Sequence, residues 1–84
     1  MQLQHSVAQI VPETDLDRQY LQAAQLTLKG DYEPALSILL AIVERDRKYQ
    51  NDAARKAMIM IFGLLEDDHP LTKSYRKQLT LALY

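Results

Sequence analysis

The sequence contains no cysteine and no tryptophan, and only two of its 84 residues are glycine and three are proline. Without cysteine, the chain can form no disulfide, no thiolate zinc site and no thiol nucleophile. So few glycines and prolines leave too little turn-forming material for a β-sandwich, whose many short strands need frequent turns. With 48% hydrophobic and 25% charged residues, the composition is that of a globular protein. These values favour one helical domain over residues 1–84.

Long apolar runs and a strong charge of one sign are also missing. No apolar run approaches the roughly 20 residues needed to cross a bilayer. The first residues, MQLQHSVAQIVPETD, lack the basic start of a signal peptide. We therefore predict a cytoplasmic protein with no membrane partner. The net charge is −1, and only residues 69–84 form a small basic end. A nucleic-acid-binding domain usually has a whole basic face, so no nucleic-acid partner is predicted.

Apolar residues recur with the period of an α-helix in five segments. The main segments predict four helices, over about residues 15–29, 32–47, 52–65 and 70–83. A short N-terminal helix is predicted before Pro12, because Leu3, Val7, Ile10 and Val11 are spaced for one face. The expected fold class is all-α, with helices stacked as consecutive hairpins.

The short stretch Gly30-Asp31-Tyr32 predicts the turn of the first hairpin. Gly30 suits the left-handed residue that often ends a helix. Asp31 suits the N-cap of the next helix, where its carboxylate can accept from first-turn amides. Pro34 falls in that first turn, where a missing N–H costs nothing. One segment therefore ends one helix and begins the next.

The fourth segment is apolar on more than one side. Its main stripe predicts the core face of a helix that starts at Asn51 or Asp52, and consists of Ala54, Ala57, Met58, Ile61, Phe62 and Leu65. Ile59 and Met60 lie outside this stripe. Their side chains are either buried against the second helix or form a second apolar surface that a partner would cover. In the next turn, His69 or Asp68 is expected to cap the last helix, with Pro70 at its first position.

Residues 16–46 resemble a tetratricopeptide repeat, a helical hairpin of about 34 residues. Ala23 and Leu26 stand where the first helix of that motif has a small and a large residue. Tyr32 would lie between the two helices, and Ala35 would let them cross closely. The resemblance implies stacked hairpins, with a groove lined mainly by the first helix of each pair.

Residues 35–84 resemble the C-terminal helical domain of bacterial thioredoxin-like co-chaperones, the chaperedoxins. The matching motifs are Arg45-Asp46-Arg47, Asp52-Ala53-Ala54-Arg55-Lys56 and Tyr75-Arg76-Lys77. The resemblance implies a non-catalytic interaction module that binds chaperones or unfolded client proteins. It also implies that the chain is the C-terminal fragment of a larger protein, whose N-terminal thioredoxin-like domain would be a further partner. No redox residue is carried over, because no matching position exists.

Catalytic and metal-binding patterns are weak. His5 and His69 lie on different segments, and His69 beside Asp67 and Asp68 is better explained by helix capping than by a metal, since no third ligand has a defined spacing. No serine has a neighbouring base or a nucleophile-elbow motif. We predict no enzyme activity, no metal and no cofactor.

Extrapolation of the repeat pattern gives candidate partner-binding residues on two helices. Those on the first hairpin are Tyr20, Ala24 and Leu28, and those on the fourth segment are Lys56, Ile59, Met60 and Leu64. A flexible thioether would suit promiscuous client binding. The alternative function is structural: homo-oligomerisation or docking of the missing domain, without a client. A more distant alternative is nucleic-acid binding through Arg45, Arg47, Lys48, Arg55 and Lys73.

Overall fold

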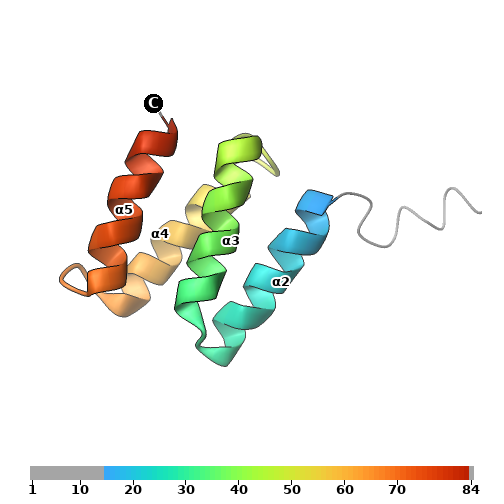
Figure 1. The fold of residues 1–84 in the computed structure, drawn as a ribbon. Helices are drawn as coiled ribbons and strands as arrows, with labels where there is room; N and C mark the ends of the chain where they lie inside the picture. The colour runs from blue at the N-terminus through green and yellow to red at the C-terminus, as the bar shows by residue number, and fades with distance from the viewer. Residues whose placement is uncertain (1–14, 84) are drawn as a thin grey trace, which may run out of the picture.

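Four helices make up the fold in the computed structural model, which describes residues 15–83 (Figure 1). They are α2 (Asp15–Lys29), α3 (Tyr32–Arg45), α4 (Ala53–Leu65) and α5 (Pro70–Leu83). All four main helices were predicted, and the only differences are that α3 ends two residues earlier and α4 begins one residue later than expected. The short helix predicted before Pro12 lies outside the described residues.

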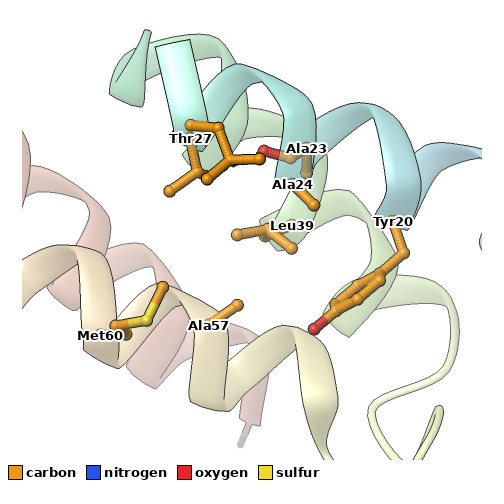
Figure 2. A pocket seen from close by; sticks show the side chains of 8 residues that line it. Tyr20, Ala23, Ala24, Thr27, Leu39, Ala57 and Met60 are labelled. Carbon is orange, nitrogen blue, oxygen red and sulfur yellow. Dashed lines mark hydrogen bonds between the residues drawn. The ribbon is translucent and has the colours of Figure 1, made fainter. Parts of the chain in front are cut away.

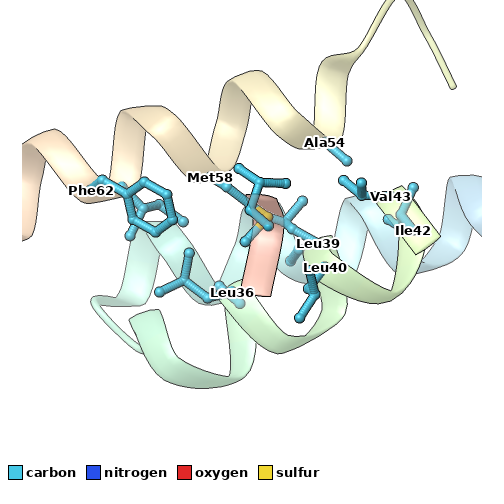
Figure 3. Close-up of a cluster of buried hydrophobic side chains, with 12 residues drawn as sticks. Leu36, Leu39, Leu40, Ile42, Val43, Ala54, Met58 and Phe62 are labelled. Carbon is cyan, nitrogen blue, oxygen red and sulfur yellow. The ribbon is translucent and has the colours of Figure 1, made fainter. Parts of the chain in front are cut away.

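Helix α3 lies at the centre of the fold and contacts each of the other helices. Helix α2 packs mainly on α3, whereas α4 and α5 pack on α3 and on each other. Figure 3 shows Phe62, Met58 and Ala54 of α4 directed toward the apolar face of α3. That face supplies half of the buried hydrophobic residues: Ala35, Leu36, Leu39, Leu40, Ile42 and Val43. The core therefore forms around α3, and α2 contributes only Ala23 as a fully buried residue.

The turn between α2 and α3 follows the prediction in its backbone. Gly30 has φ +85°, and the N–H of Asp31 donates to the carbonyl of Leu26 at 2.9 Å. This bond and the one from Gly30 N–H to Thr27 O are those of a Schellman turn. Asp31 is the N-cap residue, but the predicted side-chain cap is wrong, since its carboxylate makes no capping bond. Its φ of −87° and ψ of 74° lie outside the extended region that directs a cap side chain to the first-turn amides.

The connection between α3 and α4 forms hydrogen bonds with the end of α5 and with the start of α2. Arg47 donates a hydrogen bond from its guanidinium to the carbonyl oxygen of Leu83, at the end of α5. Tyr49 donates from its hydroxyl to Asp17, in the first turn of α2. The connection ends in three left-handed residues, the last of which, Asp52, is the N-cap of α4 but makes no side-chain cap. The position at which α4 starts, near Asp52, was thus predicted, whereas the left-handed backbone of the residues that lead into it was not.

The turn before α5 contains the side-chain cap that was predicted for this helix. The backbone N–H of Leu71 donates to Nδ1 of His69 at 3.0 Å, and Pro70 is the first residue of the helix. Glu66, which ends α4, has φ +80° and ψ 162°, a region that is almost restricted to glycine. Thr72, in the first turn of α5, is fully buried, which its residue type does not indicate.

Candidate protein-binding groove

An open cavity of about 230 Å³ lies between α2 and α4, with α3 as its floor. Figure 2 shows Tyr20 at one end of this cavity, with its ring directed toward α4, and Met60 on the facing helix. We call this cavity the α2–α4 groove. It is lined by Tyr20, Ala23, Ala24, Thr27 and Leu28 of α2, Leu39 of α3, and Ala57 and Met60 of α4.

The groove exists because its walls carry small residues and because α2 and α4 are not packed closely against each other. Helix α2 packs mainly on α3, so its side toward α4 is left open. Ala23 and Ala24 on one wall and Ala57 on the other bring little side-chain volume into the space between them (Figure 2). Leu39, which is almost completely buried, forms the floor. The sequence therefore leaves a hollow where larger side chains would have closed the fold.

The lining of the groove carries no charge and offers little hydrogen bonding. Thr27 uses its hydroxyl within its own helix, where Oγ1 donates to the carbonyl of Ala23 at 2.8 Å. That hydroxyl is therefore already paired, and Tyr20 is the other polar residue of the lining. A site of this kind suits an apolar side chain far better than an ion or a polar metabolite.

Tyr20 is held at the end of the groove by a second tyrosine. The rings of Tyr20 and Tyr49 lie 5.9 Å apart at an angle of 56°, a geometry favoured by aromatic pairs. Burial raises the pKa of Tyr49 to about 12, and its hydrogen bond to Asp17 adds to this shift. Tyr49 is therefore neutral at physiological pH and anchors the first turn of α2 to the connection before α4.

The structure brings together four of the seven predicted binding residues. Tyr20, Ala24, Leu28 and Met60 line one cavity, and the side chains of Leu28 and Met60 are 87% and 55% exposed. Lys56, Ile59 and Leu64 are exposed on α4 but lie outside the lining. The alternative that Ile59 and Met60 are buried against the second helix is wrong, because α4 turns its main stripe toward α3 and leaves both exposed.

Sequence reasoning missed the other half of the lining. It did not assign Ala23, Thr27, Leu39 or Ala57 to the groove, and it placed Ala57 on the core face of its helix. The signal that could have found Ala23 and Ala57 is the recurrence of alanine on the facing sides of two helices, which predicts either close packing or a hollow. Which of the two occurs depends on the angle between α2 and α4.

Other candidate sites are less well formed in the part of the chain that the structure describes. Residues 15–83 contain no group of three or more histidine, aspartate or glutamate residues that could hold a metal ion. No helix among them is long and apolar enough to cross a membrane. Of the basic residues considered for nucleic acid, Arg47 bonds to Leu83 and Arg55 lies 3.7 Å from the carboxylate of Asp52.

The order of the helices and the groove between the first helices of two hairpins define an all-α helical-repeat protein. A family model described as tetratricopeptide repeat matches residues 2–84, and the chain belongs to this family. The prediction of a tetratricopeptide-like fold is thereby confirmed. No curated protein and no solved structure matches the chain significantly. Tetratricopeptide repeats generally mediate protein–protein interaction.

Proposed function

We propose that this domain is a non-catalytic interaction module that binds an apolar segment of a chaperone or of an unfolded client protein in the α2–α4 groove. The observation that carries the proposal is the groove itself, an uncharged hollow with Leu28 and Met60 exposed beside it. Exposed apolar surface of this kind marks interaction sites on folded proteins. Co-chaperone function rests in addition on the resemblance of residues 35–84 to chaperedoxins, which also suggests a cytoplasmic location.

The size of the groove limits what it can accept. An engineered apolar cavity of about 150 Å³ binds benzene. The groove, at about 230 Å³, therefore has room for one aromatic side chain or two small aliphatic ones. Such a site would recognise single apolar anchors in many sequences rather than one long motif. The flexible side chain of Met60 would adapt to anchors of different shape.

The test compares two variants with the same change of charge. Met60→Asp places a carboxylate on the wall of the groove, and Leu81→Asp places one on α5, where Leu81 is 69% exposed. Both side chains reach solvent, so both variants should fold. Because a client would have to desolvate the new carboxylate, Met60→Asp should weaken capture by about tenfold or more.

The measurement is capture on beads that carry a reduced, alkylated and permanently unfolded test protein, with thermal unfolding of each variant as the control for folding. Leu81→Asp should capture as the unchanged protein does. Lys56→Ala should weaken capture modestly and make it less dependent on salt, as expected for a charge beside a binding site. A stable Met60→Asp variant that captures the test protein as well as Leu81→Asp does would contradict the proposal.

Self-association, or docking of a thioredoxin-like domain, is the second candidate function. The exposed side chains of Leu28, Ile59 and Leu64 favour it, because each copy in a dimer could bury the apolar surface of the other. Sedimentation at several protein concentrations distinguishes it from client binding. A dimer that Met60→Asp dissociates would support self-association through the groove.

A further inference from the structure

The walls of the α2–α4 groove offer contacts that are specific for an aromatic ring. The ring of Tyr20 packs on that of Tyr49 at 5.9 Å and also lines the groove, where it is directed toward α4 (Figure 2). An aromatic occupant could therefore pack edge-to-face on Tyr20. On the facing wall Met60 brings a thioether, whose sulfur also makes favourable contacts with aromatic rings. The two walls thus favour an aromatic side chain over a saturated one of the same size.

The size and the polarity of the groove narrow the choice of ring. A cavity of about 230 Å³ has room for one aromatic side chain, and a single leucine would leave part of it empty and forfeit the contacts there. The lining has two polar residues, and the hydroxyl of Thr27 already donates to the carbonyl of Ala23. A tyrosine or a tryptophan would give up water for few hydrogen-bond partners. Phenylalanine gives up no hydrogen bond.

The charge beside the groove on α4 is positive. Arg55 and Lys56 are the only charged residues of this helix. Arg55 lies 3.7 Å from the carboxylate of Asp52. Lys56 is exposed and forms no ion pair within residues 15–83. It directly precedes Ala57 of the lining and lies one helical turn before Met60 on the same side of α4.

The α2 wall supplies no charge that would oppose this one. Residues 19–28 contain no charged side chain. Before them, the carboxylate of Asp17 accepts a hydrogen bond from the hydroxyl of Tyr49. After them, Lys29 and Asp31 carry opposite charges. The charge that remains for an occupant to match is therefore that of Lys56.

We propose that the groove selects a phenylalanine side chain that is flanked by aspartate or glutamate in the partner protein. This inference rests on the proposed function and names the anchor that the groove recognises. The ring fills the cavity between Tyr20 and Met60, and the acidic neighbour stays in solvent near Lys56. An exposed charge pair of this kind adds modest affinity that salt weakens.

The selection of an aromatic ring is tested with three soluble peptides, Gly-Ser-Asp-X-Asp-Ser-Gly, in which X is phenylalanine, cyclohexylalanine or alanine. Cyclohexylalanine has a ring of similar size that is more apolar but has no π system. Each peptide is titrated into the full chain, and the methyl NMR signal of Met60 is followed with carbon-13-labelled methionine. The phenylalanine peptide should bind about two- to tenfold more tightly than the cyclohexylalanine peptide. The alanine peptide should leave the Met60 signal in place.

Two variants locate this preference. Tyr20→Phe keeps the ring and should keep the preference, whereas Tyr20→Leu should abolish it. Thermal unfolding shows whether each variant is folded. On the unchanged protein, equal binding of the two ring peptides, or tighter binding of the cyclohexylalanine peptide, would overturn the aromatic selection without any variant.

The selection of an acidic flank is tested with a fourth peptide, Gly-Ser-Asn-Phe-Asn-Ser-Gly. The acidic peptide should bind about two- to fivefold more tightly than this amide peptide at low salt. Lys56→Gln should remove the difference, and Lys77→Gln, at an exposed position on α5, should leave it unchanged. Equal affinities of the two peptides for the unchanged protein, or equal losses in the two variants, would overturn the acidic flank.

The failure of this inference can be distinguished from that of the proposed function. If the unfolded test protein shifts the Met60 signal but the two ring peptides bind equally, the groove binds proteins without selecting phenylalanine. If neither the test protein nor any peptide shifts the Met60 signal, the proposed function fails and the inference fails with it.

Discussion

The hydroxyl group of Tyr49 donates a hydrogen bond to Oδ1 of Asp17, across 32 positions of sequence. It joins the connection between α3 and α4 to the first turn of α2. The ring of the same residue packs on Tyr20, which closes one end of the groove. Tyr49 thus helps to set the position of the α2 wall relative to α4.

Tyr49→Phe should lower the free energy of unfolding by about 1 kcal/mol, the usual net value of one hydrogen bond. The ring contact with Tyr20 would be kept, so the loss reports the hydroxyl alone. Denaturant unfolding measures it, with Tyr75→Phe on α5 as a control that removes a phenolic hydroxyl elsewhere. Equal losses in the two variants would show that the bond to Asp17 adds nothing.

The same residue predicts a dependence of stability on alkaline pH. Burial, and then the bond to Asp17, raises the pKa of Tyr49 from 10.0 to about 12 in the folded protein. The stabilisation is therefore fully present below pH 10 and is lost as the pH rises through about 12. Between pH 10 and pH 12, the free energy of unfolding should fall more steeply with pH for the unchanged protein than for Tyr49→Phe. Parallel curves would contradict the shifted pKa.

Ala35→Leu should destabilise the protein by roughly 1–3 kcal/mol, because it overpacks a fully buried position on α3. Ser37→Leu changes an exposed residue of the same helix and should be nearly neutral. Thermal unfolding of both variants gives the comparison. If the two changes were equally costly, Ala35 would not lie in a tight helix contact.

Glu66→Gly should stabilise the protein by about 1 kcal/mol. Glu66 has φ +80° and ψ 162°, which costs a residue with a Cβ on the order of 1–3 kcal/mol, and the greater freedom of glycine in the unfolded chain offsets part of this gain. Lys77→Gly, at an exposed position inside α5, should instead destabilise by roughly 0.5–1 kcal/mol. If the denaturant midpoints of both variants moved in the same direction, the positive φ of Glu66 would be contradicted.

Thr72→Val should stabilise the protein by about 1 kcal/mol. Thr72 is fully buried, and its Oγ1 has no hydrogen-bond partner among the residues that the structure describes. Valine has the same shape without the cost of an unpaired hydroxyl. Thr80→Val is the control, because Thr80 is exposed and donates to the carbonyl of Arg76 at 3.0 Å. A loss of stability in Thr72→Val would mean that its hydroxyl is bonded.

The helices could be predicted because their signals are local. Gly30 and Pro70 mark helix ends through their own backbone preferences, and the apolar stripe of α4 follows from its period. The failed cap at Asp31 shows the limit of such signals. The residue type that suits a cap does not determine the backbone angles that direct its side chain.

The candidate site could be predicted only in part because it depends on how α2 and α4 are placed on α3. Tyr20, Ala24 and Leu28 follow from the repeat pattern because they face the next hairpin, and Met60 follows because it faces the previous one. Leu39 enters the lining because α2 and α4 stand apart above it. The bonds from Arg47 to Leu83 and from Tyr49 to Asp17 join distant residues, and no local pattern indicates them.

The most direct test of the central claim, that partners bind in the α2–α4 groove, is a titration followed through the methionine methyl signals. Met58 and Met60 are two positions apart on α4, yet Met58 is fully buried and Met60 lines the groove. Addition of the unfolded test protein should shift the Met60 signal in a saturable way and leave that of Met58 almost unchanged. Binding that saturates while the Met60 signal stays in place would contradict the account.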